Sequence, residues 1–263
     1  MPPLIAVLDN PEDWQLSYVA AESLGRLGDA RADGPLAALE RDHWYPPVRE
    51  AARKARAAIA GHERYVPRQH PANFDYEFDN YANAGRNVKP CHPLERSARQ
   101  TFFPDDDLRR ALDAKVTYAA GPIGYRPGRG EKPKRQVPRA ALEVIDGWLL
   151  GNARGEWGGE LLFLDRTGQQ TLLLIDNIHA LAHLGTRIVA LAGLAHMVGN
   201  RGLVYELARD AKGRWSARPW RVLPGAPWTS AMRPDGSWLI DTNSGTVVLS
   251  PEGSIKMAAC PAP

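Results

Sequence analysis

The sequence predicts an α+β fold in which an N-terminal α-solenoid of stacked helix pairs is followed by a mostly antiparallel β domain. A helical pattern over residues 16–29 returns over residues 47–59, about 31 residues later, and such a period is typical of helical repeats. Beyond residue 140, short β-like runs alternate with glycine-containing turns. We therefore expect helical repeats at 1–61, a connecting segment at 62–139 and a β-rich domain at 140–263.

The overall composition is that of an ordinary globular protein. A chain of 263 residues is long enough for one large domain or two smaller ones. Its hydrophobic content of 44% and charged content of 24% exclude wholesale disorder. The net charge of +3 is too small to indicate a nucleic-acid partner by itself. The 24 glycines and 22 prolines fall mostly after residue 60, which favours a turn-rich second part.

Cysteine usage and the apolar runs bear on the cellular compartment. Cys91 and Cys260 are far apart and form no CxxC motif, which excludes a disulfide framework and leaves a single bridge open. The N-terminal residues lack the basic region and long apolar core of a signal peptide. No run approaches the roughly 18 apolar residues that a membrane span needs. We expect a cytoplasmic protein that does not bind membranes.

The helical part begins with apolar residues at helical spacing. A helix is predicted over residues 13–27, with Asp13 capping its start and Gly28 ending it. Further helices are predicted over residues 34–41 and 48–59.

Two stretches in this part resemble HEAT repeats, in the short form found in phycobilisome-lyase-like proteins. They are Ala20-Ala-Glu-Ser-Leu-Gly-Arg-Leu-Gly-Asp-Ala30 and Pro47-Val-Arg-Glu-Ala-Ala52. The small alanine side chains would let neighbouring helices approach closely. The resemblance covers about a quarter of the chain and implies a helical stack, but such repeats serve scaffolds, lyases, regulators and inhibitors alike.

Three segments of the β domain share one scheme, in which a turn, a strand, a glycine, a second strand and a further turn follow one another. They span residues 146–168, 184–207 and 235–253, a period of about 40 to 50 residues. This pattern resembles the blades of a β-propeller, which has at least about four blades when closed. We therefore expect an incomplete propeller, one that recruits strands from residues 70–139, or one completed by another copy of the chain.

The loop at residues 155–161 holds a candidate acid/base pair. Glu156 and Glu160 flank Trp157 between glycines, as two carboxylates beside a sugar-stacking ring would in a glycosidase. In that case the carboxylates should converge in a cleft, about 5 to 10 Å apart. The structural alternative is that Trp157 fills a groove between blades while the glycines open the next strand.

Three histidines are candidate metal ligands. His179 and His183 are four residues apart, and His196 follows in another loop. On a helix the first two could share a zinc ion. They are bracketed by β-like runs, however, and no cysteine or acid completes the set, so ordinary hydrogen-bonded histidines are the favoured interpretation and no metal is expected.

The segment at residues 124–139 is a basic loop rich in proline and glycine. Its candidate binding residues are Arg126, Arg129, Lys132, Lys134 and Arg135. Such a loop could grip phosphates or an acidic partner, although most are simply solvated. A Walker-type phosphate loop is absent because no Gly-Lys-Ser/Thr occurs at the required spacing. We expect no cofactor.

These features together predict a non-enzymatic module that binds another protein, as a cytoplasmic inhibitor, immunity protein or adaptor. Self-association is left open. The alternative is a glycan-processing or lyase-type enzyme that uses Glu156 and Glu160. A weaker alternative is nucleic-acid binding through the basic loop.

Overall fold

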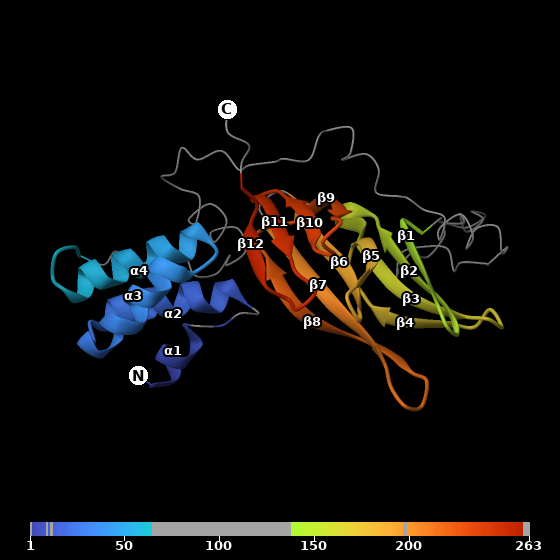
Figure 1. The fold of residues 1–263 in the computed structure, drawn as a ribbon, viewed down its shortest axis with the longest axis horizontal. Coiled ribbons are helices and arrows are strands. Elements are labelled where there is room, and N and C mark those ends of the chain that lie inside the picture. The colour runs from blue at the N-terminus through green and yellow to red at the C-terminus, as the bar shows by residue number, and fades with distance from the viewer. Residues whose placement is uncertain (1, 9, 11–12, 65–137, 197–198, 260–263) are drawn as a thin grey trace, which may run out of the picture.

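The structure of the protein is a computed structural model that describes residues 2–8, 10, 13–64, 138–196 and 199–259 (Figure 1). Within these residues, helices occupy the N-terminal part and strands the C-terminal part. The helices are α1 (Pro2–Val7), α2 (Trp14–Leu27), the 3-10 helix η1 (Ala30–Ala32), α3 (Asp33–Asp42) and α4 (Pro46–Ile59).

Helix α2 begins and ends at the residues that the sequence predicts. The Asp13 carboxylate accepts hydrogen bonds from the backbone N–H of Gln15 at 2.9 Å and of Leu16 at 3.4 Å, which caps the helix start. At the other end Gly28 adopts a left-handed φ of 67° and donates its N–H to the Leu24 carbonyl at 3.1 Å.

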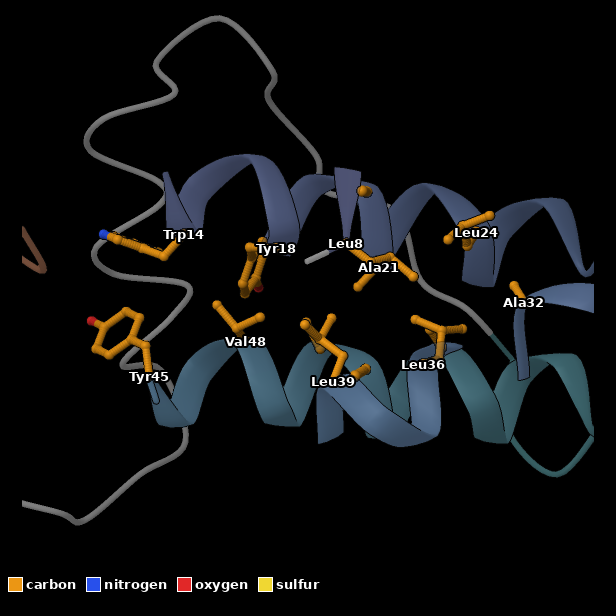
Figure 2. Close-up of a cluster of buried hydrophobic side chains, with 14 residues drawn as sticks. Leu8, Trp14, Tyr18, Ala21, Leu24, Ala32, Leu36, Leu39, Tyr45 and Val48 are labelled. Atoms are coloured by element: carbon orange, nitrogen blue, oxygen red, sulfur yellow. The ribbon is translucent and has the colours of Figure 1, made fainter. Parts of the chain in front are cut away.

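The helices enclose a small apolar core of their own. Figure 2 shows Trp14 and Tyr18 of α2 facing Val48 of α4, with Leu36 of α3 further along the same core. The rings of Trp14 and Tyr45 meet edge to face with centroids 4.5 Å apart, a geometry that aromatic pairs prefer.

Twelve strands follow in the described residues and form three antiparallel four-stranded sheets, each made of consecutive strands. Sheet A contains β1 (Ala140–Val144), β2 (Gly147–Ala153), β3 (Gly159–Asp165) and β4 (Gln170–Leu174). Sheet B contains β5 (Ile178–Leu184), β6 (Arg187–His196), β7 (Gly199–Arg209) and β8 (Trp215–Leu223). Sheet C contains β9 (Pro227–Met232), β10 (Trp238–Thr242), β11 (Gly245–Leu249) and β12 (Ile255–Met257).

The prediction of a mostly antiparallel β region is confirmed, and the propeller assignment is corrected. Each repeated segment of the sequence falls within one four-stranded sheet, as its scheme of strands and turns predicts. The described residues form three such sheets, whereas a closed propeller has at least about four blades. The β region is therefore an array of three sheets.

Two apolar cores lie between the sheets. Leu149 of β2 and Ile178 of β5 are fully buried in the core between sheets A and B. Leu191 of β6 and Trp238 of β10 are buried in the core between sheets B and C. Burial of one such aliphatic side chain stabilises the fold by roughly 1.5 to 3 kcal/mol, so these two layers hold the array together.

The predicted N-terminal α-solenoid is wrong, and so is the resemblance to HEAT repeats. The described residues contain four α-helices, of which α1 has only six residues, whereas stacked repeats need at least about three units to bury a continuous core. The apolar surface that a further repeat would cover packs instead on Val222 of β8 and Met257 of β12. The Trp14 indole also donates to the Leu223 carbonyl at 3.1 Å, so the helices form a small cluster seated on the sheets (Figure 1).

The connections between strands gather at two ends of the sheets. The turns β2–β3, β6–β7 and β10–β11 and the links β4–β5 and β8–β9 lie at one end, here called the link end, because the strands run up and down in order. Contacts between sheets bring these connections together. Glu156 and His196 form an ion pair at 3.1 Å, and Asn200 donates to the Ser244 hydroxyl at 3.0 Å.

The remaining turns form the opposite end, here called the hairpin end. There the Arg209 guanidinium donates to the Asp146 carboxylate at 2.7 Å, joining the β7–β8 hairpin to the β1–β2 turn. The β7–β8 hairpin projects beyond the rest of the β region at this end (Figure 1).

Candidate functional site

The β2–β3 turn at the link end carries Glu156 and Trp157, and Glu160 follows at the start of β3. The turn contains the 3-10 helix η3 (Gly155–Trp157), and positive φ angles, which favour glycine, occur at Gly155 at its start (62°) and at Gly158 after its end (79°). Gly158 donates its N–H to the Gly155 carbonyl at 3.0 Å, which closes the turn. Trp157 is 72% exposed, so its ring faces solvent and does not fill a groove between sheets.

Beneath the turn, Arg154 and Glu160 form a nearly buried ion pair. The two guanidinium Nη atoms donate to the two carboxylate oxygens, Nη1 to Oε1 at 2.7 Å and Nη2 to Oε2. Only 11% of the Arg154 side chain and 8% of the Glu160 side chain are exposed. A two-point pair of this kind fixes geometry as well as charge, and here it ties the start of the turn to the start of β3.

The β4–β5 link clamps the same turn from the neighbouring side. The Asn177 carboxamide oxygen accepts from the Arg154 backbone N–H at 2.9 Å, and its nitrogen donates to the Gly155 carbonyl at 2.9 Å. The Asn177 carbonyl in turn accepts from the Gly193 N–H of β6 at 3.0 Å. Asn177 therefore joins the turn of sheet A, through its buried side chain, to β6 of sheet B, through its backbone carbonyl.

Asp176 anchors this link to sheet B. Its two carboxylate oxygens accept from the Arg201 guanidinium at 2.7 and 2.8 Å, and Tyr205 donates its hydroxyl at 3.3 Å. The hydrogen bond to Asp176 raises the pKa of Arg201, while burial is the main reason that the pKa of Tyr205 is also raised. Arg201 is therefore a fixed cation, and the Asp176 carboxylate is surrounded by donors.

Two glycines allow the links between sheets to cross so closely. A Cβ atom on Gly159 would lie 2.3 Å from the Asn152 carbonyl oxygen and 2.5 Å from that of Asp176. A Cβ atom on Gly202 would lie 2.1 Å from the Gly225 carbonyl oxygen, where the β8–β9 link crosses β7. At both links between sheets, a strand glycine thus lies where the link crosses the strand, and no larger residue fits at either position without a shift of the backbone.

The structure places the two candidate catalytic acids in different environments. Glu160 is buried and paired with Arg154, whereas Glu156 is half-exposed and its Oε2 lies 3.1 Å from His196 Nε2. A general acid or base must reach the reacting group of a substrate. The Glu160 carboxylate, with both oxygens already bound by a guanidinium, has no such open side.

The three candidate metal ligands are also dispersed. His179 is the extra residue of a β-bulge in β5, and its Nε2 donates to the Gly193 carbonyl at 2.8 Å. His183 is exposed further along β5, and His196 lies at the β6–β7 turn beside Glu156. The described part of the chain contains no group of three His, Cys, Asp or Glu residues that could hold a metal ion.

Two further exposed apolar side chains lie at the link end and are not among the predicted site residues. Trp228 is the extra residue of a bulge in β9, is 53% exposed and donates its indole N–H to the Asn243 carboxamide. Ile175 follows β4 and is 62% exposed. The position of Trp228 directly after Pro227 is a sequence signal of a disturbed strand, because proline within a sheet is found mainly at edges, at strand starts and at bulges.

Several predicted site residues lie outside the described residues. They are Arg126, Arg129, Lys132, Lys134, Arg135, Cys91 and Cys260. Binding through the basic loop therefore stays a prediction, and the pairing of the two cysteines stays open.

The chain matches no protein-family model and no curated protein. The resemblances to HEAT repeats and propeller blades thus have no support beyond the sequence patterns themselves. Of the helices that the structure describes, none is both long and apolar enough to cross a membrane.

The Arg154–Glu160 pair predicts unequal roles for the two acids. Glu160→Ala should lower the free energy of unfolding by about 3 kcal/mol, because it leaves a nearly buried guanidinium without its carboxylate. Glu156→Ala is the matched control and should change it by less than about 0.5 kcal/mol, since that pair is exposed. Urea unfolding followed by circular dichroism measures both. Equal effects would contradict the structural role of Glu160.

His179 predicts a dependence of stability on pH. Burial, and to a lesser degree the charge of Arg139, lower the pKa of His179 below its ordinary value of 6.5. The hydrogen bond to the Gly193 carbonyl and the charge of Asp176 raise this pKa, but they offset the lowering only in part. The His179 imidazole therefore binds a proton more readily in the unfolded chain than in the folded one. As a result, the free energy of unfolding decreases as pH falls below about 6.5. His179→Gln should lose less stability between pH 7.5 and 5.5 than the wild type in thermal unfolding.

The exposed His62 supplies the control for this comparison. His62→Gln should follow the wild-type pH dependence, because an exposed substitution away from any core changes stability little. A His179→Gln profile that matches the wild type would show that protonation of His179 does not limit stability.

Proposed function

We propose that this chain is a cytoplasmic protein-binding module, an adaptor or inhibitor, whose recognition anchor is Trp157 at the link end. The observation that carries the proposal is a 72% exposed indole on a turn that is held from two sides. Tryptophan is enriched among the few residues that dominate protein–protein binding energies.

The hydrogen bonds around the turn support a binding role. Asn177 holds the backbone of Arg154 and Gly155, and the Arg154–Glu160 pair holds the same turn from below. A binding loop that is already fixed loses little conformational entropy when it meets its partner. The buried charges near Trp157 thus serve to position the ring.

The surroundings of Trp157 also suit a protein interface. Ile175 and Trp228 are exposed at the same end of the sheets, and the Glu156–His196 pair is half-exposed beside the turn. Apolar anchors with a polar, hydrated rim are typical of such interfaces. The low cysteine content, two in 263 residues, is consistent with the cytoplasm.

The enzymatic alternative has weaker support. It needs Glu156 and Glu160 to converge on a substrate, but Glu160 is committed to Arg154 and Glu156 contacts His196. We therefore favour binding over glycan or lyase chemistry at this turn.

Differential affinity capture from the native cell extract tests the proposal. Wild type, Trp157→Ala and Ile145→Ala serve as baits, and captured proteins are identified by mass spectrometry. Ile145 is the matched control because it is 88% exposed and lies at the hairpin end. A protein should be retained by wild type and Ile145→Ala and depleted on Trp157→Ala, with affinity weakened by about 2 kcal/mol, or roughly thirtyfold.

The same experiment can overturn the proposal. If the three baits capture the same proteins with equal affinity, Trp157 is not the anchor. If the captured material is a glycan that only Trp157→Ala fails to retain, the turn binds sugar and not protein. Thermal unfolding of each bait should show that all three are folded.

A further inference from the structure

Two arginines, one from sheet A and one from sheet B, act on the link that clamps the β2–β3 turn. Arg201 of β7 donates to both carboxylate oxygens of Asp176, at 2.7 and 2.8 Å. Arg139 directly precedes β1, and its charge acts on His179 in β5. Burial is the main reason that the pKa of His179 is lowered, and the charge of Arg139 lowers it further. Both guanidinium groups therefore lie near the same short stretch of chain.

These two arginines reach solvent, whereas the carboxylate of the link does not. Arg139 is exposed, and 42% of the Arg201 side chain is exposed, against 3% of the Asp176 side chain. Each Nη atom of Arg201 gives one hydrogen to Asp176 and carries a second one, so the guanidinium has donors left for a further acceptor. The link thus presents N–H donors to solvent and keeps its negative charge buried.

The acids of sheets A and B at the link end already have cationic partners. They form the pairs Glu160–Arg154, Asp176–Arg201 and Glu156–His196. In sheet C, Asp241 is 1% exposed and accepts from the Thr246 hydroxyl at 2.8 Å. Arg139, by contrast, forms no ion pair within the described residues. A carboxylate of a partner would therefore meet a cation that no acid neutralises, whereas an ammonium group would find only carboxylates that have partners.

The number of these cations favours a carboxylate over a nucleic-acid backbone. A backbone presents a row of phosphates, and its binding relies on several lysines and arginines placed along it. On the described link end of sheets A and B, the exposed or half-exposed arginines are Arg139 and Arg201. Two guanidinium groups on the link that clamps the Trp157 turn suit one acidic side chain beside an apolar one.

We propose that the partner binds the link end through an acidic segment, in which an Asp or Glu side chain meets Arg139 and Arg201 and a neighbouring apolar side chain covers Trp157. This inference rests on the proposed function and adds the chemistry of the partner to it. Arg201 is already oriented by Asp176, so it loses little conformational entropy on binding. Arg139 supplies the charge that attracts the acidic segment.

Peptide display on the full chain tests this chemistry. A random peptide library on phage is panned on the wild type, Trp157→Ala and Arg139→Glu. The wild type should select peptides in which Asp or Glu lies beside an apolar residue, and Trp157→Ala should not retain them. A selected peptide labelled with fluorescein should bind Arg139→Glu at least about fivefold more weakly than the wild type, because the reversed charge repels the acidic side chain.

Two variants control for the effect of charge. Arg139→Lys keeps the charge and should bind the peptide within about threefold of the wild type. Lys212→Glu makes the same change of charge at the exposed tip of the β7–β8 hairpin and should bind like the wild type. If Arg139→Glu fails to fold, the salt dependence of wild-type binding decides, and the affinity should fall as salt rises.

The outcomes separate this inference from the proposed function. Peptides that depend on Trp157 but lack acidic residues would overturn the acidic partner and leave Trp157 as the anchor. Acidic peptides whose affinity is unchanged by Arg139→Glu and by salt would do the same. A wild type that selects no peptide dependent on Trp157 would overturn both.

Discussion

The arrangement of the link end depends on the buried Asp176–Asn177 link between sheets A and B. Asp176 is 6% exposed and binds the Arg201 guanidinium with both carboxylate oxygens, while Asn177 binds the backbone of the β2–β3 turn. A buried carboxylate is tolerated only when donors surround it, so the link requires the hydrogen bonds that Arg201 and Tyr205 donate to Asp176. Gly159 completes the arrangement, because its lack of a side chain lets the link cross β3.

This constraint separates the charges that build the site from the side chains that face solvent. Arg154, Glu160 and Asp176 have their partners within the protein and hold the backbone in place. Trp157 stands outside this network with its ring exposed. A fixed polar base beneath an exposed aromatic ring suits recognition of a surface better than acid/base chemistry, in which a carboxylate must be free to exchange a proton with substrate.

Local signals in the sequence predicted much of the fold, and contacts between distant residues account for what they missed. Asp13 and Gly28 bound α2 as predicted, because helix capping depends on a few adjacent residues. The repeated β scheme likewise marked the three sheets, because turns and alternation are local. The helical repeat wrongly predicted a solenoid. Whether a stack of helices continues depends on what covers its end, and here Val222 and Met257 of the sheets cover it. At the site, the sequence pattern placed Glu156, Trp157 and Glu160 in one loop, whereas the structure places Glu160 in β3. The pairing of Asp176 with Arg201, 25 residues later, depends on the packing of β7 beside the link, which no local pattern records.

The central claim is that the buried link holds the Trp157 turn in a fixed conformation. Amide hydrogen exchange at Arg154, followed by nuclear magnetic resonance in the wild type and in Asn177→Ala, tests it most directly, because the Asn177 side chain accepts the hydrogen bond from that amide at 2.9 Å. We predict that the Arg154 amide is protected in the wild type and exchanges at least about tenfold faster in the variant, while the central amides of β6 and β7 keep their rates. An Arg154 amide that exchanges equally in both proteins would contradict the account.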